Sequence, residues 1–463
     1  MAYYTKLDKA LQSRLEKTIE DMFPAQLEAL QALVKIESVK QPPEGDYPFG
    51  LPMQKALDYT LELCREHGLE TRDLDGYVGI AEHKAGEETL GILAHLDVVP
   101  AGTGWSVPPF CGEIIDGQLY GRGVMDDKGP AISALFALSA INRCNIPLKR
   151  NVQLILGCDE ESGWACMDRF HKTEPMPTLS FTPDAEYPLV YSERTIVQGI
   201  YEAKPANTQI TIDCGERTNV VPGQALAILP QPIKLPEAPD GFEIKTEQKA
   251  DGFHVLVLGL GAHASTPELG KNAMQCLLAL LVQALPEGED LTRLRALHEA
   301  FKMDNHAETL GLDAEDESGR LTLNPGILHW DKEKISFGFD ARSPVCLSAG
   351  TIFERIDTAL APAGFVRDEA KSRVQPGHHV PLESELVQKL LGVYRTQTGD
   401  TKTQPLAIGG GTYARAMKNA VAFGCEYPGD VMVAHMPDER CKLTDILRNT
   451  HIMADAILAL AGE

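Results

Sequence analysis

The sequence predicts an α/β fold in which a mostly parallel sheet is covered by helices on both faces. Three apolar runs, at residues 89–99, 152–162 and 178–186, have the composition of buried strands that end in polar residues. Helical patterns at residues 8–36, 53–68 and 130–143 precede or separate these runs. Because continuous apolar strands that alternate with helices are typical of parallel sheets buried on both faces, we expect this architecture.

The character of the sequence changes between about residues 191 and 377. Strand patterns become shorter, and a proline-rich stretch, LPQPIKLPEAPDG, and an acidic loop, DAEDESG, occur there. We interpret residues 191–377 as an inserted α+β lid domain, within a catalytic domain formed by residues 1–190 and 378–463. A long amphipathic helix at 382–399 resumes the catalytic domain. With 463 residues, the chain is long enough for each domain to bury its own core.

Composition and charge exclude several classes of protein. The 43 Lys and Arg residues against 66 Asp and Glu residues give a formal charge of −23, which opposes binding to nucleic acid or to an anionic membrane. The ten cysteines are scattered without a CxxC pair, which favours reduced thiols over a disulfide scaffold. Residues 1–23 form a charged helical pattern without a secretory core, and the apolar segment 273–285 is too short to span a bilayer. We therefore expect a cytoplasmic protein.

Candidate metal-binding side chains follow the apolar runs. His95 and Asp97 lie two positions apart, so on a strand they would project from the same face. An aspartate in that position could hold the ring nitrogen of His95 that does not bind a metal. The adjacent acids Glu160 and Glu161 follow the second run, and Asp184 follows the third. Because ligands bind beyond the carboxyl ends of parallel strands, we expect these side chains to share one site.

Two further segments add acids and a histidine. In GRGVMDDKGP, Asp126 and Asp127 lie in a Gly-rich turn that opens a helix, where they could bind a cation or interact with the helix N-terminus. His435, in VAHMPDER, lies at a strand end or in a loop. Of Glu160 and Glu161, one could hold a metal while the other takes a proton from water. The residues themselves leave open which glutamate, and which of the two aspartates, has which role.

The joint pattern resembles the co-catalytic zinc metallopeptidases, the family of carboxypeptidase G, aminoacylase and carnosinase. The strings GRGVMDDKGP, GAHASTPELGKNA and GGGTYAR, together with the long insertion, are most similar to dipeptidase V-like Xaa-His dipeptidases. The resemblance implies five ligands for two zinc ions: His95 and Asp184 for one, Glu161 and His435 for the other, and Asp126 as the bridge. It also implies that Asp97 orients His95 and that Glu160 is the general base. Manganese or cobalt would also suit such ligands.

The insertion contributes most of the implied substrate contacts. The resemblance implies that His263 stabilises the oxyanion, that Asn219 is a polar substrate contact and that Arg342 binds the substrate carboxylate. Backbone N–H groups of residues 409–412, including Gly410, could also hold this carboxylate. With both substrate ends bound, we expect hydrolysis of dipeptides with free termini, either of Xaa-His or β-alanyl type or with broad specificity. The long insertion is similar to the type that supplies its own oxyanion histidine, which is compatible with a monomer and also with a dimer.

Two other functions stay open on the sequence alone. An N-acyl amino acid deacylase or amidohydrolase could use the same two-metal centre without needing a free substrate amine. The presence of Asp rather than Glu at position 184 is more similar to the aminopeptidase and dipeptidase branch of the family. An inactive binding protein that retains the fold is the third alternative, and the complete ligand set together with Glu160 weighs against it.

Overall fold

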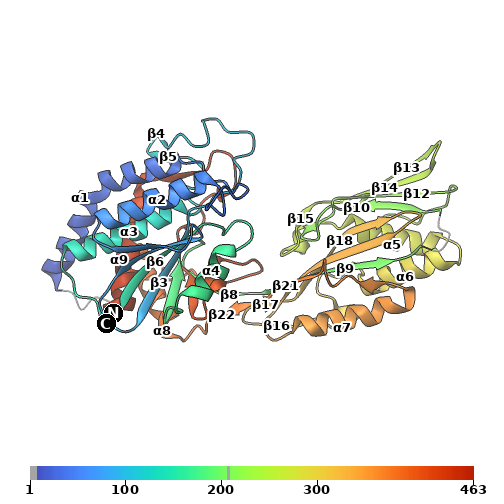
Figure 1. Cartoon of the computed structure of the whole chain (residues 1–463). Helices are drawn as coiled ribbons and strands as arrows, with labels where there is room; N and C mark the ends of the chain where they lie inside the picture. Colours follow the sequence, from blue (N-terminus) through green and yellow to red (C-terminus); the bar gives the residue numbers. More distant parts are fainter. Residues whose placement is uncertain (1–7, 206–208, 463) are drawn as a thin grey trace. The chain divides into compact units, whose positions relative to one another are not determined.

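The computed structural model describes residues 8–205 and 209–462 (Figure 1). The chain forms two compact units. The first contains residues up to Tyr191 together with Val380–Leu406 and Thr412–Glu463, and the second contains Ser192–His379 and Ala407–Gly411. Residues 1–7 of the N-terminal helical pattern lie outside the described residues.

A nine-stranded mixed sheet forms the centre of the first unit. Its order is β1 (Glu70–Asp73), β2 (Val78–His83), β6 (Asn151–Gly157), β3 (Thr89–His95), β7 (Leu179–Thr182), β24 (Ala420–Ala422), β8 (Val190–Glu193) and β22 (His378–His379), with β23 (Leu406–Ile408) also paired to β8. Strands β6, β3, β7 and β24 run parallel, and the strands at both margins are antiparallel. The α/β class is confirmed, but parallel pairing is confined to the centre. At one margin the reason is local, because a tight turn at 74–77 joins β1 to β2 and permits only antiparallel neighbours.

Helices cover both faces of this sheet. They are α1 (Lys9–Val34), α2 (Leu51–Glu66), α3 (Lys128–Arg143), α4 (Ala165–Thr173), α8 (Glu385–Thr398), α9 (Leu443–Ala461) and the short η4 (Tyr413–Ala416). Leu90 and Ile92 of β3 belong to a core shared with α1, α2, α3, α8 and α9. Leu93 follows Ile92 and is also fully buried. Because successive side chains point to opposite faces of a sheet, Leu93 lies on the other face, which η4 contacts. A small three-stranded sheet of β25 (Arg440–Lys442), β5 (Gln118–Tyr120) and β4 (Glu113–Ile115) completes the unit.

The four long helices of this unit that the periodicity predicts are confirmed, with small shifts of their ends. Local sequence explains these ends. Asp8 caps α1 by accepting the N–H of Leu11 at 2.8 Å, and the Ser384 side chain accepts the N–H of Val387 at the start of α8. Gly399 ends α8 with φ 74°, a conformation that glycine adopts without strain.

The second unit is an antiparallel sheet packed against helices. The sheet order is β13 (Glu243–Lys249), β14 (Gly252–Leu258), β12 (Gln224–Leu229), β10 (Thr211–Cys214), β18 (Thr322–Trp330), β19 (Ile335–Ser343), β9 (Thr195–Ala203) and β20 (Val366–Arg367), with β21 (Arg373–Gln375) also on β9. The helices are α5 (Ala273–Ala284), α6 (Glu289–Ala300) and α7 (Ala349–Leu360), with η1 (Pro267–Leu269), η2 (Glu308–Leu310) and η3 (Ala361–Ala363). Strand β9 alternates buried and half-buried residues, as expected of a sheet with one core-facing side. Two strand pairs lie outside the large sheet, β11 (Val220–Val221) with β15 (Ala262–His263) and β16 (Glu315–Asp316) with β17 (Gly319–Arg320).

All ten cysteines are free thiols and eight of them are buried, as their scattered spacing predicted. Across residues 8–205 and 209–462, none of the helices combines the length and the apolar character needed to cross a bilayer.

Candidate metal centre

The polar residues that end or follow three parallel strands lie at one edge of the first sheet. His95 is the last residue of β3, Glu160 and Glu161 follow β6, and Asp184 follows β7. Because these strands run in the same direction, their carboxyl ends meet at this edge. Asp97 lies beyond the end of β3 and not within a strand, so the shared-face argument for His95 and Asp97 does not apply.

Two loops complete the centre. Asp126 lies in the turn before α3, and His435 lies in the loop before β25, with φ 62°. In the first loop, Gly123 has φ 89°, and a Cβ at this position would lie 2.9 Å from Cγ1 of Val98. Both the backbone conformation and the lack of space therefore require glycine there.

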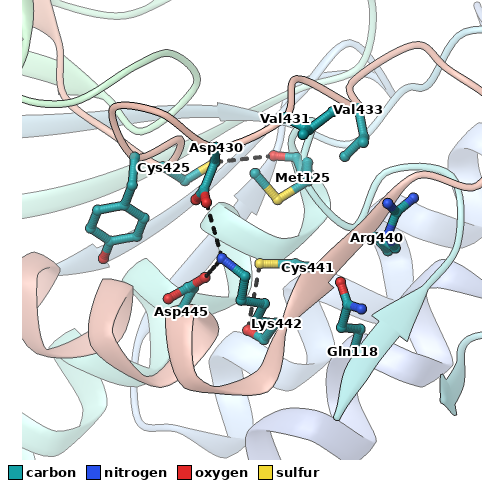
Figure 2. Close-up of a pocket in the computed structure, with 11 residues that line it drawn as sticks. Gln118, Met125, Cys425, Asp430, Val431, Val433, Arg440, Cys441, Lys442 and Asp445 are labelled. Carbon is teal, nitrogen blue, oxygen red and sulfur yellow. Dashed lines mark hydrogen bonds and ion pairs between the residues drawn. The ribbon is translucent and has the colours of Figure 1, made fainter. Parts of the chain in front are cut away.

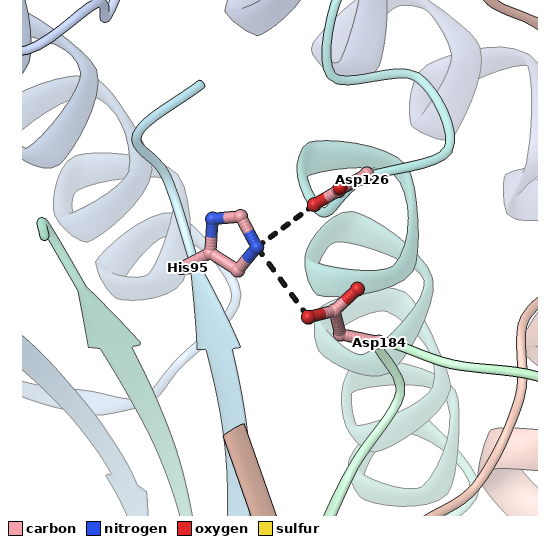
Figure 3. A group of neighbouring side chains, drawn as sticks. All are labelled: His95, Asp126 and Asp184. Carbon is pink, nitrogen blue, oxygen red and sulfur yellow. Dashed lines mark ion pairs between the residues drawn. The ribbon is translucent and has the colours of Figure 1, made fainter. Parts of the chain in front are cut away.

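The side chains form two groups that share Asp126. Nε2 of His95 lies 2.9 Å from Oδ1 of Asp126 and 3.6 Å from Oδ2 of Asp184 (Figure 3). Nε2 of His435 lies 2.8 Å from Oδ2 of Asp126 and 3.0 Å from Oε1 of Glu161. Each carboxylate oxygen of Asp126 therefore faces a different histidine, which is the arrangement expected of a carboxylate that bridges two cations.

Two atoms of the first group are buried without a hydrogen bond. Among the described residues, Nε2 of His95 and Oδ1 of Asp126 have no hydrogen-bond partner, although they face each other. Nδ1 of His95 lies 3.0 Å from the backbone oxygen of Asp97, and since a carbonyl can only accept, Nδ1 donates. In the neutral ring, Nε2 then presents a lone pair towards the carboxylates. A lone pair and carboxylate oxygens that converge in this way fit a cation.

Asp97 acts through two different groups. Its backbone oxygen holds His95, while its carboxylate oxygens accept the N–H groups of Glu160 and Glu161, each at 3.0 Å. Oδ1 of Asp97 is farther from Nδ1 of His95, at 3.5 Å. The side chain therefore fixes the turn that carries the two glutamates, and the main chain orients the histidine.

Asp126 and Asp127 have distinct surroundings, although their sequence context is the same. Asp127 is fully buried, and its Oδ2 accepts the backbone N–H of His95 at 3.0 Å. Asp126 instead faces the histidine rings. Glu160 and Glu161 also differ, because within the described part of the chain only Glu161 belongs to a group that could hold a metal.

Two buried carboxylates that the sequence did not single out hold the loops of the centre. Glu439 is fully buried, accepts Nη1 of Arg122 at 2.7 Å, and accepts the backbone N–H groups of residues 123, 125 and 126 at 2.9–3.3 Å. Asp159, also buried, accepts Nζ of Lys40 at 2.6 Å. Glu439 occurs among other charged residues in VAHMPDER, so its local sequence is typical of a solvated loop.

The loop that carries His435 is also tied at its base. A pocket of about 180 Å³ lies beside this loop, lined by residues from 425–433 and 440–445 together with Gln118 and Met125. Figure 2 shows these side chains. Nζ of Lys442 lies 3.0 Å from Oδ1 of Asp430 and 3.3 Å from Oδ2 of Asp445. These pairs connect the start of the loop to the beginning of α9.

The electrostatics of the centre favour bound cations. Burial raises the pKa of Glu160 well above its usual value, and repulsion from Asp184 adds to this shift. Burial also raises the pKa of Asp184. Although burial alone would raise the pKa of Asp126, the hydrogen bond from His435 helps to hold it well below its ordinary value. The contacts of His435 with Asp126 and with Glu161 together raise the pKa of His435 to about 10. Buried carboxylates that repel one another are stabilised by cations, and imidazole with carboxylate donors suits zinc, manganese or cobalt.

The predicted substrate contacts all lie in the second unit. Pairing of β11 with β15 brings Asn219 and His263 together, because the backbone oxygen of Asn219 accepts the N–H of Ala264 at 3.0 Å. Nδ1 of His263 accepts the N–H of Ser265 at 3.1 Å. In the neutral ring, Nε2 of His263 therefore carries the proton and can donate.

Arg342 and the Gly-rich segment, the other predicted substrate contacts, lie against each other in this unit. Arg342 is buried, and its Nε and Nη2 donate to Asp340 at 2.6 and 3.2 Å. Nη1 donates to the backbone oxygen of Gly409, next to Gly410, at 2.6 Å. These contacts place Arg342 beside the segment of residues 407–411 and use three of the five N–H donors of its guanidinium.

The sequence of the chain is similar to that of a known family of peptidases. A model of peptidase family M20/M25/M40 matches residues 91–459. "Putative dipeptidase YtjP" of Bacillus subtilis is 36% identical over 432 residues, which cover 89% of this chain and 92% of that protein. A relative from Staphylococcus epidermidis described as "Putative dipeptidase" is 34% identical over 459 residues, which cover 94% of this chain and 97% of that protein.

Solved structures show the same fold at low sequence identity. Human carnosine dipeptidase 1 matches with a TM-score of 0.60 and 16% identity, over 98% of this chain and 100% of that chain. The di-peptidase Dug1p of Saccharomyces cerevisiae matches with a TM-score of 0.56 and 13% identity, over 99% of both chains. The family model and the relatives above 30% identity confirm the resemblance of the motifs, and the chain belongs to peptidase family M20/M25/M40.

Proposed function

We propose that this chain is a metal-dependent dipeptidase that hydrolyses dipeptides with free amino and carboxyl termini. The observation that carries the proposal is the position of Asp126, whose two oxygens face His95 and His435 at 2.9 and 2.8 Å. The residues that would hold two zinc ions, or manganese or cobalt in their place, are His95 and Asp184, Glu161 and His435, and the shared Asp126. Cations bound there would acidify a water molecule and polarise the scissile carbonyl.

Glu160 is the proposed general base. It would take the proton of the attacking water and deliver it to the leaving amine. Its main chain is held by Asp97, and burial raises the pKa of its side chain, which suits a group that must both accept and donate a proton. Asp97 is thereby a positioning residue for Glu160 and, through its backbone oxygen, for His95.

The second unit would provide the substrate contacts. His263 can donate from Nε2 to an oxyanion, since its Nδ1 accepts the N–H of Ser265. Asn219, adjacent to it, would contact the polar backbone of the substrate. Arg342 and the N–H groups around Gly410 would bind the substrate carboxylate. Dipeptides with both termini free are therefore the proposed substrates, and Xaa-His or β-alanyl dipeptides are the narrower class that the motif resemblance suggests.

The activity can be tested with metal-stripped protein and with protein reloaded with zinc, manganese or cobalt. The substrates are a free dipeptide, its N-acetylated form and a tripeptide. We expect metal-dependent cleavage of the free dipeptide alone. Cleavage of the acetylated form instead would assign the chain as a deacylase, and no cleavage with any metal would indicate a binding protein.

The metal sites can be tested independently of activity. Asp126→Asn should lower the number of zinc ions bound per chain, because Asp126 belongs to both ligand groups. Asp168→Asn, which changes an exposed acid in α4, is the matched control and should bind as much zinc as the unchanged protein. Equal zinc content in the two variants would contradict the shared site.

A further inference from the structure

Arg194 is a half-buried arginine that forms no ion pair with the described residues. Its Nη1 donates to the backbone oxygen of Arg320 at 2.6 Å, and its Nη2 donates to that of Ser265 at 3.3 Å. Its Nε is buried and has no hydrogen-bond partner among the described residues. The ion pairs of residues 8–205 and 209–462 do not include Arg194, although buried arginines are normally paired with an anion.

Arg194 lies against the same glycine that Arg342 contacts. Its backbone N–H donates to the oxygen of Ile408 at 3.0 Å, which ties it to the segment of residues 407–411. A Cβ on Gly409 would overlap Nη2 of Arg194, and the oxygen of Gly409 accepts Nη1 of Arg342 at 2.6 Å. Gly409 therefore touches both guanidinium groups, and all of these residues belong to the second unit.

The charged groups near Gly409 differ in how far they are neutralised by neighbouring groups. The charge of Arg342 is already neutralised by Asp340, with Nε and Oδ1 2.6 Å apart and both side chains buried. Burial, followed by repulsion from Arg342, lowers the pKa of His263, so this histidine is neutral near pH 7. Glu268 attracts Arg194 electrostatically but forms no ion pair with it. Arg194 is therefore the charged group near Gly409 that no ion pair of the described residues neutralises.

We propose that Arg194 is a second arginine that binds the substrate carboxylate, and that it supplies the net charge for this contact while Arg342 supplies oriented N–H donors. The inference rests on the proposed dipeptidase function and deepens it. Two adjacent guanidinium groups with one net charge match a single carboxylate. The substrates selected are therefore peptides with a free C-terminal carboxylate, and C-terminal amides are disfavoured.

The test compares a dipeptide with its C-terminal amide as substrates of the metal-loaded protein. Arg194→Ala should raise KM for the dipeptide about 10- to 100-fold, because a charge-assisted hydrogen bond is lost, with a smaller change in kcat. It should leave kcat/KM for the amide nearly unchanged, so the preference for the free acid falls by the same factor. Arg194→Lys should recover part of the preference, since it retains the charge but not the planar fork.

Two further variants separate binding from structure. Arg367→Ala removes another partly buried arginine of the second unit, which pairs with Asp357, and should keep the acid-to-amide preference. Gly409→Ala should displace the guanidinium of Arg194 and reduce the same preference. In protein that already carries Arg194→Ala, Gly409→Ala should change the acid-to-amide preference less, because the guanidinium group that it displaces is already absent.

The possible results distinguish this inference from the function on which it rests. Equal losses for the acid and the amide in Arg194→Ala and Arg194→Lys would overturn the inference alone and indicate a structural role for Arg194. A parent protein that cleaves no free dipeptide with any metal would overturn the dipeptidase function and the inference together. Loss of the acid preference at an unchanged melting temperature would support both.

Discussion

The buried ion pair of Arg122 and Glu439 allows a quantitative test of how the turn before α3 is held. Nη1 of Arg122 and Oε2 of Glu439 are 2.7 Å apart, and the side chains are 2% and 0% exposed. Glu439→Gln keeps the shape and one acceptor for the N–H groups of residues 123–126, but it removes the charge opposite Arg122. Breaking one side of a buried pair costs about 3–5 kcal/mol of unfolding free energy, because the other charge stays buried and unpaired.

A matched control lies in the same unit. Nε of Arg150 and Oε2 of Glu88 are also 2.7 Å apart, but the side chains are 18% and 54% exposed. For Glu88→Gln we expect a loss of about 0–1 kcal/mol, since water solvates the remaining charge. The distance is equal in the two pairs, so the difference between the variants measures the effect of burial.

Urea unfolding of the zinc-loaded proteins, followed by circular dichroism, provides the measurement. Glu439→Gln should also weaken zinc binding by about 10- to 100-fold, because Glu439 accepts the backbone N–H of Asp126, a proposed ligand. Zinc affinity is measured by competition with a chelator. If Glu439→Gln costs no more than Glu88→Gln and binds zinc as tightly as the parent protein, the reasoning is refuted.

Other predictions concern catalysis and pH. Glu160→Gln should lower kcat by about 10²- to 10⁴-fold at unchanged zinc content, and retained activity would contradict its role as the base. Lys40→Met leaves the buried Asp159 without its ammonium partner. Because Asp159 precedes the proposed base Glu160, this variant should decrease kcat by a larger factor than it changes KM, and unchanged kinetics would contradict this. Burial lowers the pKa of His67 and His451 below the usual 6.5, so below that pH the unfolded chain binds more protons and stability falls as the pH falls. Melting temperatures from pH 7 to 5 should decrease less steeply in His67→Asn and His451→Asn, and an equal slope would refute this cause.

Much of the first unit could be predicted from the sequence because its signals are local. Helical periodicity located α1, α2, α3 and α8, and apolar runs located β3, β6 and β7, since both patterns reflect which face of an element is buried. The runs also placed His95 at a strand end. The motifs alone did not decide which of Glu160 and Glu161 is the base, or which of Asp126 and Asp127 is the metal ligand. Only the resemblance to a known family chose between them.

The contacts of these side chains were decided by the tertiary structure. Sequence spacing suggested that the Asp97 side chain holds His95. In the structure this carboxylate accepts the N–H groups of Glu160 and Glu161 at 3.0 Å, while its Oδ1 also lies 3.5 Å from Nδ1 of His95. The antiparallel margins of the sheet had no signal in the apolar runs, because a buried strand has the same composition in either direction. The sequence indicated no role for Glu439 or Arg194, which occur next to other polar or charged residues.

The sequence by itself determined the class of fold, the approximate positions of the main helices and strands of the first unit, and the candidate metal-binding residues. Only the tertiary structure decided that one carboxylate, Asp126, faces both His95 and His435, and that Arg194 and Arg342 touch the same glycine. The physical reason is that periodicity records the burial of neighbours along the chain. Contacts between distant segments depend on the path of the backbone, and that path follows from the packing of all the elements together.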